Sequence, residues 1–118
     1  MDRSFAKNFA AEWVAAWNSR DLDRVLKHYS DDFEMASPYI VSIMGEPSGV
    51  LKGKTAVAAY WTKALALLPQ LKFELLNLFV GANSLVIRYR NDRNVEVAEA
   101  LFFNANGMVN KAAAHYDE

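Results

Sequence analysis

A single acidic side chain, Glu99, interrupts an alternating apolar segment near the end of the chain. Successive side chains of a β-strand point to opposite faces, so Glu99 is expected to share a face with Val97 and Leu101. A carboxylate walled by apolar side chains loses hydration, which favours its neutral form and raises its pKa toward neutral pH. Glu99 is therefore the candidate general acid or base for a cyclase-type or isomerase-type reaction on a small carbonyl compound.

A second strand supplies the other half of this wall. Beyond the turn at residues 104–107, the side chains of Ala112, Ala114 and Tyr116 fall on one face, and small side chains there would leave space. We therefore predict a mostly apolar pocket that binds a small hydrophobic ligand. Besides Glu99, the side chains expected to line it are Trp13, Trp17, Ser37, Tyr39, Trp61, Ile87, Tyr89, Val97, Leu101, Phe103, Ala112, Ala114 and Tyr116. In an alternative interpretation, Glu99 hydrogen-bonds a Tyr or Trp inside the pocket and does no chemistry.

Three helices are expected to position these side chains, at residues 4–18, 21–29 and 53–68. Each segment repeats apolar residues at helical spacing. Asp21 can cap the second helix, and Pro69 ends the third. His28 lies near the end of the second helix, where a cation is favourable, so we interpret it as a capping, solvent-facing residue.

The strands are expected at residues 33–37, 71–80, 85–90, 94–103 and 108–117. We predict that residues 39–49, which are apolar but bounded by Pro and Gly, form a loop that covers the pocket opening. Helices followed by a run of antiparallel strands indicate an α+β fold. The prediction is one domain over residues 1–118, with three N-terminal helices on the concave face of a bent, mostly antiparallel sheet.

The composition argues against several classes of protein. The chain is 53% hydrophobic with a formal net charge of −1, so it is packed and lacks the basic surface of a nucleic-acid binder. It has no Cys and no apolar segment long enough to span a membrane, and we expect it in the cytoplasm. Two scattered His give no metal-ligand spacing, and no cofactor is expected. No His or Lys is placed by sequence to activate Ser37 as a nucleophile.

The side chains on the other face of the strands predict a homodimer. They are Val86, Arg88, Arg90, Glu96, Ala98, Ala100, Phe102, Ala113 and His115. Small apolar residues at the centre with charged residues at the edges are typical of an interface core with a polar rim.

Several segments together carry a resemblance to a known family. They are Phe9–Asp23, Tyr29–Phe33 with the strand that ends at Pro38, Leu51–Ala56, Phe103–Val109 and His115–Asp117. The chain resembles the nuclear transport factor 2-like superfamily, in the branch of SnoaL-like, polyketide-cyclase-like and ketosteroid-isomerase-like domains. The resemblance implies a cone with an interior cavity between the helices and the concave face of the sheet. It also implies homodimers that meet through the outer sheet face.

The catalytic groups of the steroid-isomerase-like members are only partly present. Those members carry a Tyr on the first helix, an Asp base before the Pro that ends the first strand, and a second acid on the fourth strand. The matching residues here are Trp13, Ser37 and Glu99, so the base is missing and steroid-type isomerisation is not expected.

Two further activities of the superfamily are also doubtful. Epoxide-hydrolase-like members place an acid where this chain has Ala114, and dehydratase-like members use a pair of pocket histidines. Strand alternation points His115 away from the cavity, and His28 is not at a matching position. Three functions stay open: a small cyclase-type or isomerase-type enzyme using Glu99, a non-catalytic carrier of an apolar metabolite, and a dimeric interaction module.

Overall fold

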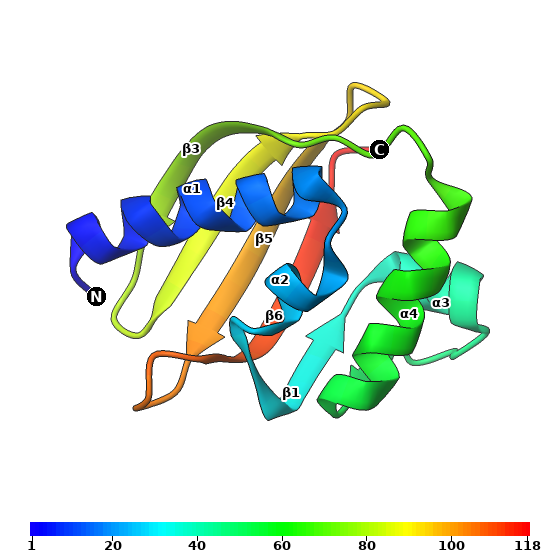
Figure 1. The fold of residues 1–118 in the computed structure, drawn as a ribbon, viewed down its shortest axis with the longest axis horizontal. Coiled ribbons are helices and arrows are strands. Elements are labelled where there is room, and N and C mark those ends of the chain that lie inside the picture. The colour runs from blue at the N-terminus through cyan, green and yellow to red at the C-terminus, as the bar shows by residue number, and fades with distance from the viewer.

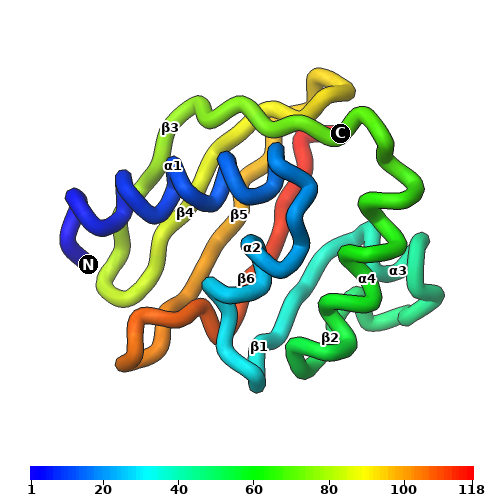
Figure 2. The backbone as a smooth tube through the Cα atoms, in the orientation of Figure 1, coloured from blue at the N-terminus to red at the C-terminus, as the bar shows by residue number.

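A bent six-stranded sheet, covered on one face by helices, forms the computed structural model (Figures 1 and 2). The strands are β1 (Tyr29–Ala36), β2 (Val50–Lys52), β3 (Glu74–Val80), β4 (Ser84–Arg90), β5 (Glu96–Phe103) and β6 (Val109–Tyr116). Their order across the sheet is β2-β1-β6-β5-β4-β3. All neighbours are antiparallel except β1 and β6, which run parallel. The predicted α+β fold class, with a mostly antiparallel sheet, is confirmed.

The helices are α1 (Arg3–Ser19), α2 (Leu22–Leu26), α3 (Pro38–Met44) and α4 (Lys54–Leu67). Helix α1 crosses the sheet and packs against β3, whereas α4 packs against β1 (Figure 1). The helices therefore cover the two halves of the sheet separately.

Local signals fix where α1 begins and ends. The Asp2 carboxylate accepts a hydrogen bond from the Phe5 amide at 3.1 Å and so caps the first turn. At the other end, Arg20 adopts a left-handed conformation with φ of 62°. Its amide donates to the Trp17 carbonyl, which closes the last turn.

The segment predicted to be a covering loop is instead helix α3, so that prediction is wrong. Ser37 caps the helix, because its hydroxyl accepts from the Tyr39 amide at 3.2 Å. Pro38 occupies the first helical position, where its missing N–H costs nothing, and Gly45 ends the helix with φ of 68°. The same residues that suggested the end of a strand and a loop are thus the start and stop signals of a short helix.

Two other boundaries differ from the sequence prediction. Tyr29 begins β1 instead of ending the second helix, since α2 stops at Leu26. Strand β2 was not predicted at all, because its three residues are too few to show alternation and pair only with β1.

The register of the sheet places Glu99 at the centre of the concave face. Its neighbours across the strands are Ile87 on β4 and Ala114 on β6. Glu99 is 4% exposed, and the side chains that share its face, Val97 and Leu101, are fully buried. The alternation read from the sequence therefore gives the correct inner and outer faces for these strands.

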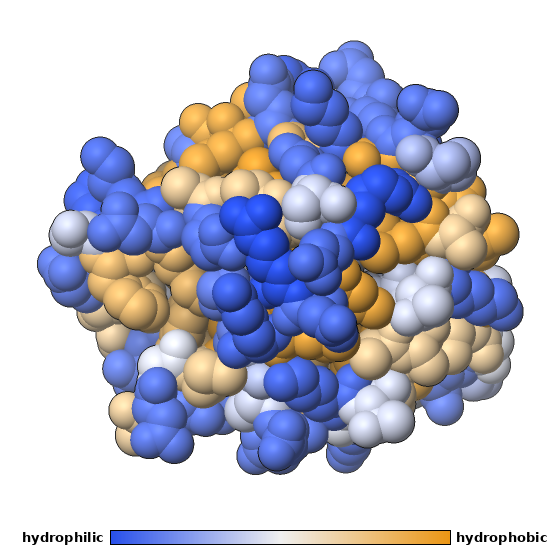
Figure 3. Space-filling view, viewed as in Figure 1, coloured by the Kyte–Doolittle hydropathy of each residue, from blue (hydrophilic) through white to orange (hydrophobic).

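Helices α1 and α2 carry a hydrophilic outer surface, while the surface beside them where α4 lies is largely hydrophobic or neutral (Figure 3). None of the helices has the length and the hydrophobicity that a membrane-spanning segment needs.

Candidate functional site

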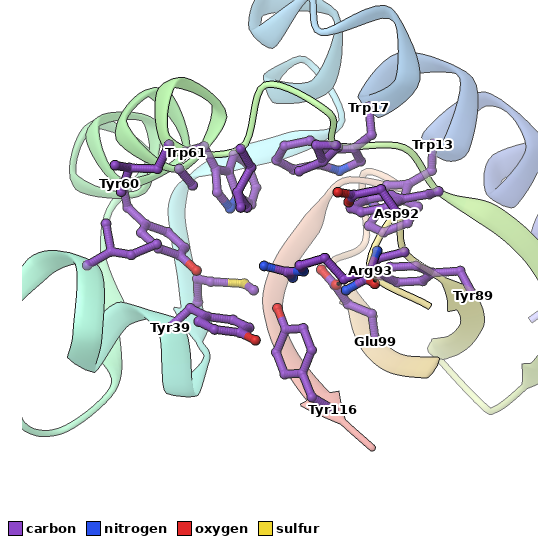
Figure 4. Close-up of a pocket in the computed structure, with 18 residues that line it drawn as sticks. Trp13, Trp17, Tyr39, Tyr60, Trp61, Tyr89, Asp92, Arg93, Glu99 and Tyr116 are labelled. Carbon is purple, nitrogen blue, oxygen red and sulfur yellow. Dashed lines mark hydrogen bonds between the residues drawn. The ribbon is translucent and has the colours of Figure 1, made fainter. Parts of the chain in front are cut away.

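A cavity of about 280 Å³ opens on the concave side of the sheet, between the ends of α1 and α4 (Figure 4). Fourteen of the 18 residues that line it are hydrophobic. The lining residues are Trp13, Trp17, Met35, Tyr39, Ile43, Tyr60, Trp61, Ala64, Leu67, Leu68, Leu71, Phe73, Tyr89, Asn91, Asp92, Arg93, Glu99 and Tyr116. The cavity is thus mostly apolar, with a few polar groups that could orient a ligand.

Two polar residues at the end of α1 hold the walls of the cavity together. The Arg20 guanidinium donates to the carbonyls of Leu65 and Leu68 at 2.6 and 3.0 Å, and so binds the last turn of α4. The Asn18 amide forms two hydrogen bonds with the backbone of Phe73, at 2.9 and 2.7 Å. These contacts fix α4 and the segment before β3 relative to α1.

Glu99 is the acidic group of the cavity interior. The Tyr89 hydroxyl donates to Glu99 Oε1 at 3.0 Å. Burial raises the pKa of Glu99 from 4.5 to about 7, and the hydrogen bond from Tyr89 offsets part of that rise. A carboxyl group with this pKa is present in both its acid and its base form near neutral pH, which suits proton transfer.

Tyrosine hydroxyls surround Glu99 and stay protonated. Burial raises the pKa of Tyr60 to about 12 and that of Tyr116 further, and the charge of Glu99 adds to both shifts. Burial also raises the pKa of Tyr89, the hydrogen-bond partner of Glu99. The Tyr60 and Tyr116 hydroxyls can therefore donate hydrogen bonds to a ligand but cannot act as bases, whereas the Tyr89 hydroxyl donates its hydrogen bond to Glu99.

The two tryptophans of α1 differ in their hydrogen bonding. The Trp13 indole N–H donates to the Tyr29 hydroxyl at 2.8 Å, so it is already satisfied. The Trp17 indole N–H is buried and has no hydrogen-bond partner. Figure 4 shows Trp17 at the edge of the cavity, facing Trp61. An unsatisfied buried donor is costly, and a ligand with an acceptor atom would satisfy it.

Seven of the residues expected from the sequence to form the site, Glu99 included, line the cavity. These are Trp13, Trp17, Tyr39, Trp61, Tyr89, Glu99 and Tyr116. They come from α1, α3, α4, β4, β5 and β6, so the fold brings together side chains that are far apart in the sequence (Figure 4).

The other seven lie elsewhere: Ser37, Ile87, Val97, Leu101, Phe103, Ala112 and Ala114. Ser37 is the cap of α3. Phe103 packs against Phe5 and Phe9, with ring centroids 5.8 and 5.0 Å apart, under the start of α1. The remaining five belong to the packed core.

The expected space beside the alanines of β6 is filled. Ala112 is flanked by Met35 on β1 and Leu101 on β5, and all three are buried. Ala114 lies beside Glu99. The larger neighbours occupy the volume that the small side chains leave, so the cavity lies nearer the other end of the strands.

Sequence analysis missed the residues at the mouth of the cavity. Asn91, Asp92 and Arg93 belong to the turn between β4 and β5, where strand alternation gives no direction for a side chain. Tyr60 lies on α4, and nothing in the helical pattern distinguishes a core position from a cavity wall.

No group of three or more His, Asp or Glu side chains is placed to hold a metal ion.

Comparison with known proteins identifies the family. The model of the SnoaL-like domain matches residues 10–117. The chain belongs to the SnoaL-like family. The predicted resemblance is therefore confirmed.

Solved structures agree with this assignment. A SnoaL-like protein of unknown function from Burkholderia thailandensis is 46% identical, with a TM-score of 0.95 over 99% of this chain and 98% of that one. A protein from Agrobacterium tumefaciens, provisionally named an isomerase of the SnoaL-like family, is 16% identical with a TM-score of 0.76, over 96% and 97% of the two chains. A provisionally named polyketide cyclase from Sinorhizobium meliloti is 13% identical with a TM-score of 0.72, over 88% and 90%. None of the curated proteins compared with this SnoaL-like domain matches it.

Proposed function

We propose that this SnoaL-like domain binds a small, flat, mostly apolar carbonyl compound and that Glu99 moves a proton on it as general acid and base. The observation that carries the proposal is a buried carboxyl group with a pKa of about 7 on the wall of an apolar cavity. The Agrobacterium relative is provisionally named an isomerase and the Sinorhizobium relative a polyketide cyclase. Both names describe reactions of the same kind as the proposed proton transfer.

The aromatic walls favour a flat ligand. Trp17 and Trp61 meet edge to face with ring centroids 5.0 Å apart, and Phe73 packs on Tyr89 at 4.3 Å. Aromatic rings prefer such offset and edge contacts with other rings, so a conjugated ligand can add to this arrangement. The Trp17 indole N–H is free to donate to its carbonyl oxygen.

The proton transfer would run in two steps. The Glu99 carboxylate removes a proton from the carbon next to the carbonyl, and the C–H electron pair forms a C=C bond while the carbonyl oxygen becomes an enolate. The protonated Glu99 then gives a proton back. Its return to a conjugated carbon gives isomerisation, and its return to the same carbon gives hydrogen exchange once the carboxyl proton has exchanged with solvent. No oxidant or reductant is needed, and the buried site keeps water away from the enolate.

Hydrogen exchange tests this chemistry without a known substrate. With 2-acetylnaphthalene as probe in D₂O, NMR follows the loss of the methyl protons next to the ketone. The native protein should accelerate this exchange over buffer on the order of 10²-fold, the lower range for a positioned general base. Glu99→Gln should bind the probe and lose the acceleration. Equal exchange rates with the native protein and with Glu99→Gln would contradict a catalytic role for Glu99.

A second function, a carrier without catalysis, is favoured by the surroundings of Glu99. Trp13 and Ser37 occupy positions that hold catalytic groups in steroid-isomerase-like relatives, yet the first donates to Tyr29 and the second caps α3. A carrier would bind 2-acetylnaphthalene, and neither the native protein nor Glu99→Gln would accelerate exchange over buffer, so the same experiment separates the two functions.

We also propose that two copies of the chain pair through the outer face of the sheet. Phe79, Val86, Ala100 and Ala113 form one row across four strands of this face, and Phe79 is 55% exposed. Ion pairs from Arg88 to Glu96 and from Arg90 to Glu74 and Glu96 lie along one side of this row. An exposed apolar row with a charged border is typical of a subunit interface.

A further inference from the structure

Arg93 is an unpaired cation at the mouth of an apolar cavity. It lines the cavity, yet no Asp or Glu oxygen lies within 4.0 Å of its guanidinium, although five other ion pairs form in the same protein. Its guanidinium carbon lies 5.6 Å from the centroid of the Tyr39 ring, which is a cation–π contact. Figure 4 shows the side chain reaching from its turn toward Tyr39 and Tyr116.

The turn that carries Arg93 is held in place. Asn91 is 7% exposed, and its side-chain oxygen accepts from the amides of Arg93 and Val95 at 2.9 and 3.0 Å. The Asn94 amide donates to the Asn91 carbonyl at 3.0 Å. The backbone of Arg93 is therefore fixed by a buried residue, and its exposed side chain lies at the cavity mouth.

The neighbouring charges do not satisfy Arg93. Asp92 also lies at the mouth but forms no ion pair with it. The Glu118 carboxylate accepts a hydrogen bond from the Tyr39 hydroxyl instead. A guanidinium presents its N–H groups as a planar fork that matches the two oxygens of a carboxylate.

A second, independent observation comes from the cavity interior. The buried Trp17 indole N–H has no partner, which indicates a hydrogen-bond acceptor on the ligand. The cavity thus has two donors without a protein partner, a buried neutral one among the aromatic walls and a solvent-exposed cationic one at the opening.

We infer that the ligand of this cavity is an aromatic keto acid, whose carboxylate pairs with Arg93 at the mouth and whose ketone accepts from Trp17. The inference rests on the proposed function and narrows it, because it adds an acidic group to the flat carbonyl compound. Arg93 is then a specificity residue that holds the ligand with its ketone directed inward.

Matched probes test this assignment by calorimetry at pH 6, where Glu99 is mostly neutral. The probes are 6-acetyl-2-naphthoic acid and 6-acetyl-2-naphthamide, which differ in charge but hardly in shape. The native protein should bind the acid about three- to tenfold more tightly than the amide, the range expected of a partly exposed ion pair. Arg93→Gln should lose this preference and bind the amide as before, while Asp92→Asn should keep the preference.

Each result has a definite meaning. Equal affinity for acid and amide in the native protein, or a preference that survives Arg93→Gln, would overturn the role of Arg93 while leaving apolar binding intact. Failure of both probes and of 2-acetylnaphthalene to bind would overturn the proposed function itself. For Trp17, NMR should show its indole proton moving downfield with the acetyl probes but not with 2-ethylnaphthalene, which has no carbonyl group. An indole signal that moves with neither acetyl probe would contradict the ketone contact.

Discussion

The hydroxyl of Tyr89 and the carboxyl of Glu99 lie 3.0 Å apart on adjacent strands, and both residues are buried. This hydrogen bond favours the ionised form of Glu99, while burial favours the neutral form and is the larger effect. The pKa of about 7 is thus the balance of two opposing contributions, and each can be changed separately.

Tyr89→Phe should raise the pKa of Glu99 above 7. The substitution removes the hydrogen bond but keeps the ring, which packs against Phe73 and Trp13. The titration midpoint of the Glu99 carboxyl carbon, followed by ¹³C NMR, measures the change. Tyr39→Phe is the control, since Tyr39 donates to Glu118 and not to Glu99. A lower midpoint in Tyr89→Phe would contradict the assigned direction.

Glu99→Gln should stabilise the protein at high pH. The folded pKa is raised from 4.5 to about 7, so stability from Glu99 is present below pH 4.5 and is lost as pH rises through 7. Relative to the native protein, Glu99→Gln should therefore gain about 2 kcal/mol in free energy of unfolding between pH 5 and pH 8, since one pKa unit corresponds to about 1.4 kcal/mol. Urea denaturation at the two pH values measures this gain. A difference between the proteins that does not change with pH would show that Glu99 titrates normally.

Ser37→Ala should destabilise the fold by about 1 kcal/mol, the usual cost of removing a helix cap. The Ser37 hydroxyl accepts from the Tyr39 amide, so its loss weakens the start of α3 and with it the wall that carries Tyr39. Ser37→Thr keeps a capping hydroxyl and should retain more of the stability. Chemical denaturation of both variants decides the point, and an unchanged Ser37→Ala protein would exclude a capping role.

Ala100→Arg should convert a dimer into a monomer. Ala100 lies between Val86 and Ala113 on the outer sheet face, where a long charged side chain would prevent close approach of a second copy. Light scattering at tens of micromolar gives the mass. Ala59→Arg, the same change at an exposed position of α4, is the control and should stay dimeric. A native protein that is monomeric at this concentration would refute the proposed interface.

The inward or outward direction of each side chain on β5 and β6 could be predicted, because each strand has one buried face and one outer face. Glu99 was placed correctly in the interior for this reason, and the outward direction of His115 followed from the same pattern. Helix α4 was equally clear, since its apolar side is long and Pro69 limits its end.

The position of the cavity could not be predicted, because it depends on which neighbours fill a space. Ala112 suggested an opening, but Met35 and Leu101 lie on either side of it. Arg93 could not be assigned to the cavity, since the direction of a turn residue depends on contacts such as those of Asn91. Helix α3 was missed because Ser37 and Pro38 suit both the end of a strand and the start of a helix.

The most direct test of a buried, partly neutral Glu99 is its pKa. The pKa can be measured by ¹³C NMR of the side-chain carboxyl carbon, with Glu99→Gln used to assign the signal. A midpoint near 7 that moves when 2-acetylnaphthalene is added is the predicted result. A midpoint near 4.5, unchanged by the probe, would show that Glu99 is an ordinary hydrated carboxylate and would contradict both the cavity chemistry and the ligand assigned to it.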